Sequence, residues 1–62
     1  MTFALYQITD NGLAFISKHV SSTMAMIQST IIAECGDWEY FKTPVHETWV
    51  SDAFCIMSEA GE

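Results

Sequence analysis

Residues 2–8, TFALYQI, are rich in aromatic and aliphatic side chains, and Asp10-Asn11-Gly12 follows them. Asn-Gly tolerates the positive φ angles of a tight turn, so the pattern predicts a β-hairpin in which residues 13–18 return. A competing interpretation is one long helix over residues 11–35, because apolar residues recur there at spacings of three and four. Those residues are Leu13, Ile16, Val20, Met24, Ile27, Ile31 and Cys35. We favour the hairpin, since residues 2–8 would otherwise lack a strand partner.

A helix over residues 21–35 follows from its end signals. Ser21 or Ser22 can cap the free amides of the first turn, and Gly36 can supply a left-handed stop. The apolar stripe of this helix is expected to face the core. It consists of Val20, Met24, Ile27 and Ile31.

The second half of the chain predicts one short strand and a second helix. Residues 38–41, WEYF, have strand character, and Thr43-Pro44 is a typical helix start. From there to Gly61, apolar and polar positions follow a helical period that predicts a helix over residues 44–60. Its expected apolar face is Trp49, Ala53, Ile56 and Ala60, with Val50, Phe54 and Met57 beside it. A strand is the alternative, but strict alternation fails at Trp49-Val50 and Ile56-Met57.

These elements predict an α+β fold in a single domain spanning residues 1–62. A small antiparallel sheet, made of the N-terminal hairpin and a short third strand, would pack against two helices; the alternative is an all-α helical hairpin or bundle. So short a chain buries only about 60% of its unfolded surface. With 50% apolar residues it nevertheless has enough hydrophobic side chains for a core.

The net charge of −6 narrows the choice of partner. Lys18 and Lys42 are the only Lys or Arg residues, so direct nucleic-acid binding is rejected, because it depends on cations replacing counterions along the phosphates. The acidic balance favours a basic protein surface instead. The most apolar run, residues 24–35, is too short to span a bilayer, and we expect no membrane association.

Candidate chemistry is sparse. Cys35, Cys55, His19 and His46 are zinc-ligand types, but no two lie two to four residues apart, so no metal or other cofactor is expected. Neither cysteine has a cationic neighbour in sequence that would lower its pKa, and the chain is not expected to be an enzyme. The N-terminus does not have the pattern of a signal peptide, so we expect free thiols in the cytoplasm.

The remaining feature is a concentration of aromatic and acidic side chains after residue 33. Trp and Tyr dominate interface hot spots, and we predict a partner-binding surface on residues 37–42 and the outward face of the last helix. Its members are Asp37, Trp38, Glu39, Tyr40, Glu47, Asp52 and Glu59.

The sequence thus predicts an acidic protein-binding module that inhibits or adapts a larger basic partner, such as a nucleic-acid-binding protein. The analogy is with phage-encoded anti-defence or host-takeover inhibitors. One alternative is a self-associating structural subunit that uses the apolar stripe of residues 13–35. The other is a metal or redox domain built on the two cysteines.

Overall fold

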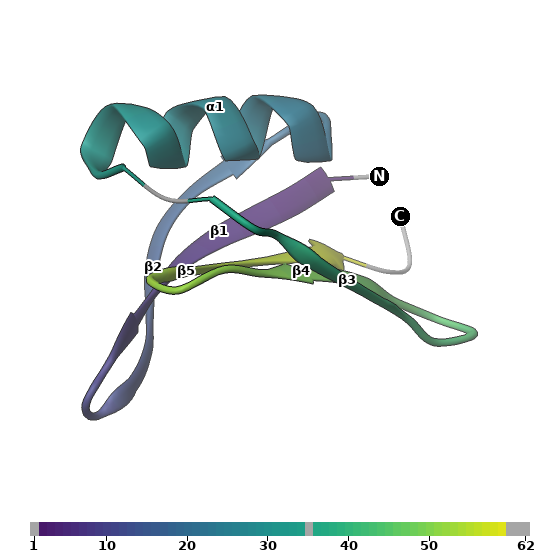
Figure 1. Ribbon diagram of the computed structural model, residues 1–62. Coiled ribbons are helices and arrows are strands. Elements are labelled where there is room, and N and C mark those ends of the chain that lie inside the picture. The colour runs from purple at the N-terminus through teal and green to yellow at the C-terminus, as the bar shows by residue number, and fades with distance from the viewer. Residues whose placement is uncertain (1, 35, 60–62) are drawn as a thin grey trace.

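The described part of the chain forms a five-stranded antiparallel sheet with one helix on one face (Figure 1). The computed structural model describes residues 2–34 and 36–59. The strand order is β2-β1-β5-β4-β3, so the strand nearest the C-terminus pairs with the first. In chain order the elements are β1 (Thr2–Thr9), β2 (Gly12–His19), α1 (Ser22–Ile32), β3 (Glu39–Lys42), β4 (Glu47–Val50) and β5 (Phe54–Glu59).

The N-terminal hairpin is confirmed, and the long helix over residues 11–35 is wrong. β1 and β2 pair from Phe3 opposite His19 to Thr9 opposite Gly12, with a shift of register between Leu5 and Tyr6 that leaves Ile16 without an opposed residue. The turn itself is Asp10-Asn11, and Gly12 adopts a φ of 120°, which favours glycine. The Thr9 hydroxyl closes the turn by donating to the Gly12 carbonyl at 2.8 Å.

The helix after the hairpin is also present, but it ends earlier and in another way than predicted. Ser21 is the N-cap, and its hydroxyl accepts a hydrogen bond from the Met24 amide at 3.2 Å. The last helical residue is Ile32, after which Ala33 is extended. Gly36 has no positive φ and supplies no left-handed stop; Gly12 and Asp37 (φ 56°) have the positive φ angles among the described residues.

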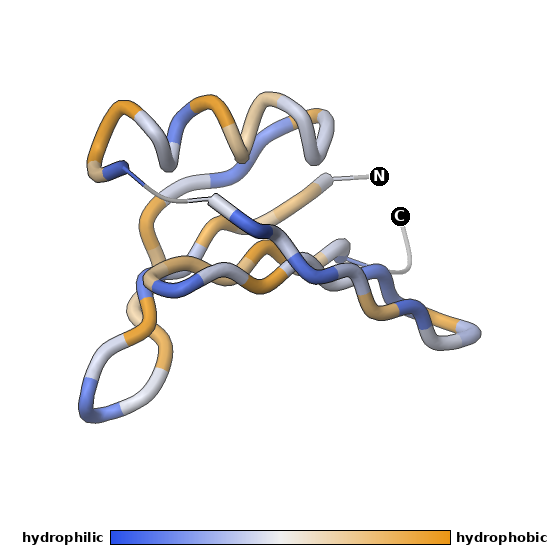
Figure 2. Tube along the Cα trace, in the orientation of Figure 1, coloured by the Kyte–Doolittle hydropathy of each residue, from blue (hydrophilic) through white to orange (hydrophobic). Residues whose placement is uncertain are grey.

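The predicted orientation of this helix is wrong. Its buried residues are Ala25 and Ser29, which face the sheet. Of the apolar stripe expected in the core, Val20 precedes the helix, and the other three residues lie on the opposite, solvent-facing side of α1 (Figure 2). The exposed fractions are 73% for Val20, 50% for Met24, 55% for Ile27 and 72% for Ile31.

The predicted second helix over residues 44–60 is wrong, and with it the fold class of two helices and three strands. Residues 47–50 and 54–59 form β4 and β5. Thr43 does accept a hydrogen bond from the His46 amide, at 3.0 Å, as an N-cap would. That bond closes the β3–β4 turn, in which Pro44 sets the φ of the second position. The all-α alternative is excluded as well.

The core lies between α1 and the centre of the sheet. Leu5, Ala25, Phe54 and Ile56 are each 0% exposed and form one cluster. Leu5 and Ile56 are cross-strand partners on the two central strands, β1 and β5. Half-buried side chains, including Phe3 and the two tryptophans, surround this cluster.

We predict that truncating Phe54 has a far larger effect than truncating the exposed Phe41. Phe54→Ala should cost roughly 3–5 kcal/mol of unfolding free energy, enough to unfold most of so small a domain. Phe41, 52% exposed on β3, should lose about 0.5 kcal/mol or less on the same change. Urea titration followed by circular dichroism measures both.

Phe54→Leu is a milder truncation that keeps the loss within the measurable range. Equal urea midpoints for Phe54→Leu and Phe41→Leu would contradict this placement of the core.

Candidate functional site

The side of the sheet turned away from α1 has no described element packed on it (Figure 1). We call it the open face. Its side chains follow from strand register, because directly opposed residues of antiparallel strands point to the same side. They are Thr2, Ala4, Tyr6, Ile8, Leu13, Phe15, Lys18, Glu39, Phe41, Thr48, Val50, Cys55, Met57 and Glu59.

Two rows of these side chains cross all five strands. The first row runs Lys18, Ala4, Met57, Thr48, Phe41, and the second runs Phe15, Tyr6, Cys55, Val50, Glu39. Each row is apolar or neutral apart from one charged residue at an edge strand. The open face is therefore an uncharged centre with a cation at one edge and a carboxylate at the other.

The apolar side chains of the open face are exposed mainly on the hairpin and on β3. Phe15 is 57% exposed, and Ile8, Leu13 and Phe41 are exposed as well. The rings of Tyr6 and Phe15 meet edge to face, with their centroids 5.9 Å apart. In a two-layer fold, the face of a sheet away from its helix is ordinarily polar. Ala4 and Cys55, which lie between these two groups, are buried. Exposed apolar side chains grouped on a sheet face are typical of an interaction site.

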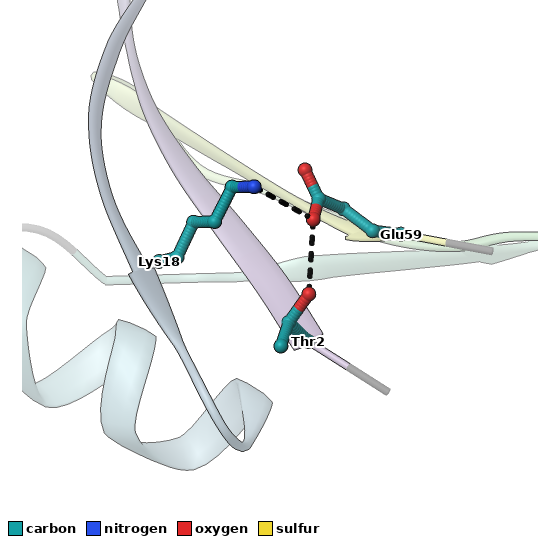
Figure 3. A network of polar contacts seen from close by, with 3 residues as sticks. All are labelled: Thr2, Lys18 and Glu59. Carbon is teal, nitrogen blue, oxygen red and sulfur yellow. Dashed lines mark hydrogen bonds and ion pairs between the residues drawn. The ribbon is translucent and has the colours of Figure 1, made fainter. Parts of the chain in front are cut away.

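A polar cluster lies at the Glu59 end of the open face. The Glu59 carboxylate accepts a hydrogen bond from the Thr2 hydroxyl at 2.9 Å and pairs with the Lys18 ammonium at 3.2 Å (Figure 3). Both contacts are made by Oε1. The Thr2 hydrogen bond and then Lys18 lower the pKa of Glu59 below its ordinary value of 4.5.

A pocket of about 380 Å³ adjoins this cluster. Tyr6 and Met57 give it apolar walls, and His46 and Glu59 give it polar ones. The remaining lining residues are Thr43, Thr48 and Ser58. His46 is held in place there by a 3.2 Å hydrogen bond between its Nδ1 and the Ser58 carbonyl oxygen. An aliphatic chain ending in a cation fits this combination of walls.

The seven residues predicted to bind a partner do not form one surface. Glu39 and Glu59 belong to the open face. Glu39 lies on the edge strand β3, and Glu59 is the last residue of β5. Asp37 and Asp52 are exposed in the loops near the Val50 end of β4. The predicted outward face of a last helix does not exist, because that segment forms strands.

The other three predicted residues lie on the helix side of the sheet or beside the core. Tyr40 is exposed, and its ring centroid is 4.9 Å from that of Trp49. Trp38 is half-buried against the core cluster. Glu47 is half-buried, and its amide donates to the Ser58 hydroxyl at 2.8 Å.

Sequence reasoning missed the hairpin half of the open face, Tyr6, Ile8, Leu13 and Phe15. A signal was present in residues 2–8. Both alternating sets of that strand are largely apolar, with Phe3 and Leu5 on one side and Ala4, Tyr6 and Ile8 on the other. Apolar residues on both sides of a strand are typical of strands that are buried on both faces of the sheet.

Cys55 lies at the centre of the open face as a buried free thiol. Burial raises its pKa, which keeps the thiol neutral and poorly nucleophilic at neutral pH. Cys35, its partner in the alternative hypothesis of a metal or redox domain, lies outside the described residues. Within residues 2–34 and 36–59, no three His, Cys, Asp or Glu side chains are grouped to hold a metal ion.

In the part of the chain that the structure describes, no helix has the length and apolar character needed to cross a membrane. Comparisons of the chain with protein-family models, curated proteins and solved structures find no match. The surface geometry is therefore the basis for inferring a function.

We predict that the Glu59 cluster makes stability depend on pH. Because the pKa of Glu59 is lowered in the folded state, its contribution is present above about pH 4.5 and is lost as pH falls through the folded pKa. Glu59→Gln should have a lower Tm than the wild type at pH 7, and this Tm difference should disappear in acid. When Lys18 is also replaced by Gln, the Tm difference caused by Glu59→Gln at pH 7 should be smaller. A Tm difference that stays constant from pH 7 to pH 3 would contradict this assignment.

Proposed function

We propose that this chain is a non-enzymatic protein-binding module that docks a larger, basic partner on its open face. The observation that supports the proposal most directly is the exposure of Phe15, Leu13, Ile8 and Phe41 on a sheet face without a covering layer. Burying such a surface against a partner is favourable by about 25 cal/mol for each Å² of apolar area.

Charge around the open face favours a basic partner over an acidic one. Asp10 at the hairpin tip, Glu39 on the edge strand and Asp52 in the β4–β5 turn are exposed carboxylates near its borders. Lys18, the cation on this face, already pairs with Glu59. An apolar centre with a charged rim is the usual anatomy of a protein interface.

The pocket beside Glu59 suits a lysine or arginine of the partner. Tyr6 and Met57 would contact the aliphatic part of that side chain, and Glu59 would share its carboxylate between Lys18 and the charge of the partner. A partner whose basic surface is covered in this way loses access to acidic ligands such as nucleic-acid phosphates. The module would therefore act as an inhibitor or adaptor of that partner, as the analogy with phage-type inhibitors suggests.

The proposal includes no catalytic step and places the protein in the cytoplasm. The buried, neutral thiol of Cys55 suits a reducing compartment and has a structural role as one of the packed side chains of the sheet. Glu59 is engaged with Lys18 and Thr2, which suits recognition of charge.

The open face is tested by replacing its two most exposed hairpin residues. The bait is the immobilised protein, and the readout is quantitative mass spectrometry of proteins captured from host lysate. Leu13→Ser with Phe15→Ser should lose the basic proteins that the wild type captures, by about tenfold or more, since truncating interface hot spots costs about 2 kcal/mol or more.

Val45→Ser is the matched control. It removes an exposed apolar side chain from the β3–β4 turn, outside the open face, and should capture the same proteins as the wild type. Unchanged capture by the Leu13/Phe15 variant would show that the open face is not the docking site.

Charge reversal tests the acidic rim. Glu39→Lys with Asp52→Lys changes exposed side chains, so the fold should keep its stability within about 0.5 kcal/mol per site. The net charge falls from −6 to −2. Association with a captured basic partner should slow strongly, most of all at low salt where screening is weakest. An unchanged association rate in surface plasmon resonance would make these carboxylates solubilising surface only.

A further inference from the structure

The helix α1 displays its most hydrophobic side to solvent. Met24, Ile27 and Ile31 are each at least half exposed, and we call them the outer stripe. They lie across the helix from Ala25 and Ser29, the two residues buried against the sheet. The outer stripe is therefore separate from the open face, which lies on the other side of the sheet (Figures 1 and 2).

The spacing of the outer stripe is that of a helix–helix seam. Its members are separated by three and four residues. This is the alternation of the two apolar positions in a heptad, which brings side chains onto one line facing a second helix. Exposed Thr23 and Thr30 flank the stripe on one side and half-buried Gln28 on the other, and all three are uncharged.

The absence of charged side chains near the outer stripe indicates which helix can pack against it. Residues 20–33 contain no charged side chain, in a chain whose net charge is −6. Two copies of such a chain repel each other wherever their carboxylates meet, so a contact between copies is favoured on the surface that lacks them. The outer stripe is such a surface. A stripe presented to itself is also self-complementary, as a two-fold interface requires.

Other occupants fit less well. A helix that lies on a membrane ordinarily has lysines and arginines along its polar side, and α1 has none. A basic partner would gain no electrostatic attraction from an uncharged stripe, whereas the carboxylates around the open face offer it.

From these observations we infer that the protein forms a two-fold symmetric dimer in which the outer stripes of two copies pack against each other. Ile27, in the middle of the stripe, lies nearest the two-fold axis. In an antiparallel pair, Met24 of each copy lies toward Ile31 of the other, and the two helix dipoles oppose each other favourably.

The dimer is weak and reversible. The helix has 11 residues and is therefore about 16 Å long. The area that its outer stripe can bury is smaller than the area of about 800 Å² that each partner buries in a standard interface. Because the open faces of the two copies point away from the seam, dimerisation leaves both of them accessible. A partner with two basic sites would then be bound bivalently.

Sedimentation equilibrium of the full chain, from about 1 μM to 1 mM, tests the inference directly. The wild type should show a reversible monomer–dimer equilibrium. Ile27→Lys should be monomeric throughout, with its circular dichroism unchanged because Ile27 is exposed. If that variant does not fold, Ile31→Lys, at a still more exposed position, serves in its place.

Asn11→Lys is the matched control, because it makes the same change of net charge at the hairpin tip. It lowers the repulsion between copies and should dimerise at least as tightly as the wild type. A wild type that is monomeric over the whole concentration range overturns the inference. So does an Ile27→Lys variant that dimerises like the wild type, or a wild type that sediments with phosphatidylcholine–phosphatidylserine vesicles and does not dimerise in solution.

Salt separates this inference from the proposed function. The Debye length falls from about 30 Å at 0.01 M salt to about 8 Å at 0.15 M, so salt screens the repulsion between two acidic copies and should tighten the dimer by about tenfold. Binding to a basic partner should weaken over the same range. The Glu39→Lys, Asp52→Lys variant should likewise dimerise more tightly while binding the partner less well. A dimer that loosens with salt would contradict the outer stripe as the interface.

Discussion

The helix meets the sheet through its smallest side chains, and the placement of most other residues depends on that contact. Ala25 and Ser29 are 0% exposed between α1 and the cluster of Leu5, Phe54 and Ile56. Small side chains let the helix backbone approach the sheet closely, so that the thin core is filled by the larger residues of the strands. The bulky residues of α1 are then left on its outer side. The helix is held by the sheet through only part of its apolar surface.

The result is a single layer of sheet and a single helix, each with one apolar side uncovered. Hydrophobic side chains left in water add nothing to the stability of a fold, and large exposed apolar patches are typical of interaction sites. The two surfaces differ in charge. The open face has carboxylates at its borders and suits a basic partner, whereas the outer stripe is uncharged and suits a second copy of the chain.

Local signals predicted the hairpin and the start of α1, because Asn11-Gly12 and Ser21 act through contacts a few residues away. The failures concern longer-range packing. Phe54, Cys55 and Ile56 are all buried in β5, a central strand, so the alternation that identifies a half-exposed strand was absent and a helix was predicted instead. Helical periodicity correctly identified the apolar side of α1 at Met24 and Ile27. It could not say which side the sheet would cover, because that depends on the close fit of Ala25 and Ser29.

The most direct test of this account is the solvent exposure of individual isoleucine methyl groups. A methyl-labelled sample, dilute enough to be monomeric, would be titrated with a soluble paramagnetic agent and observed by NMR. Ile27 and Ile31 should broaden strongly, while Ile56, which is 0% exposed, should remain sharp. Equal protection of Ile27, Ile31 and Ile56 would show that the outer stripe packs into the core, and would contradict the arrangement of helix and sheet on which both proposed interfaces depend.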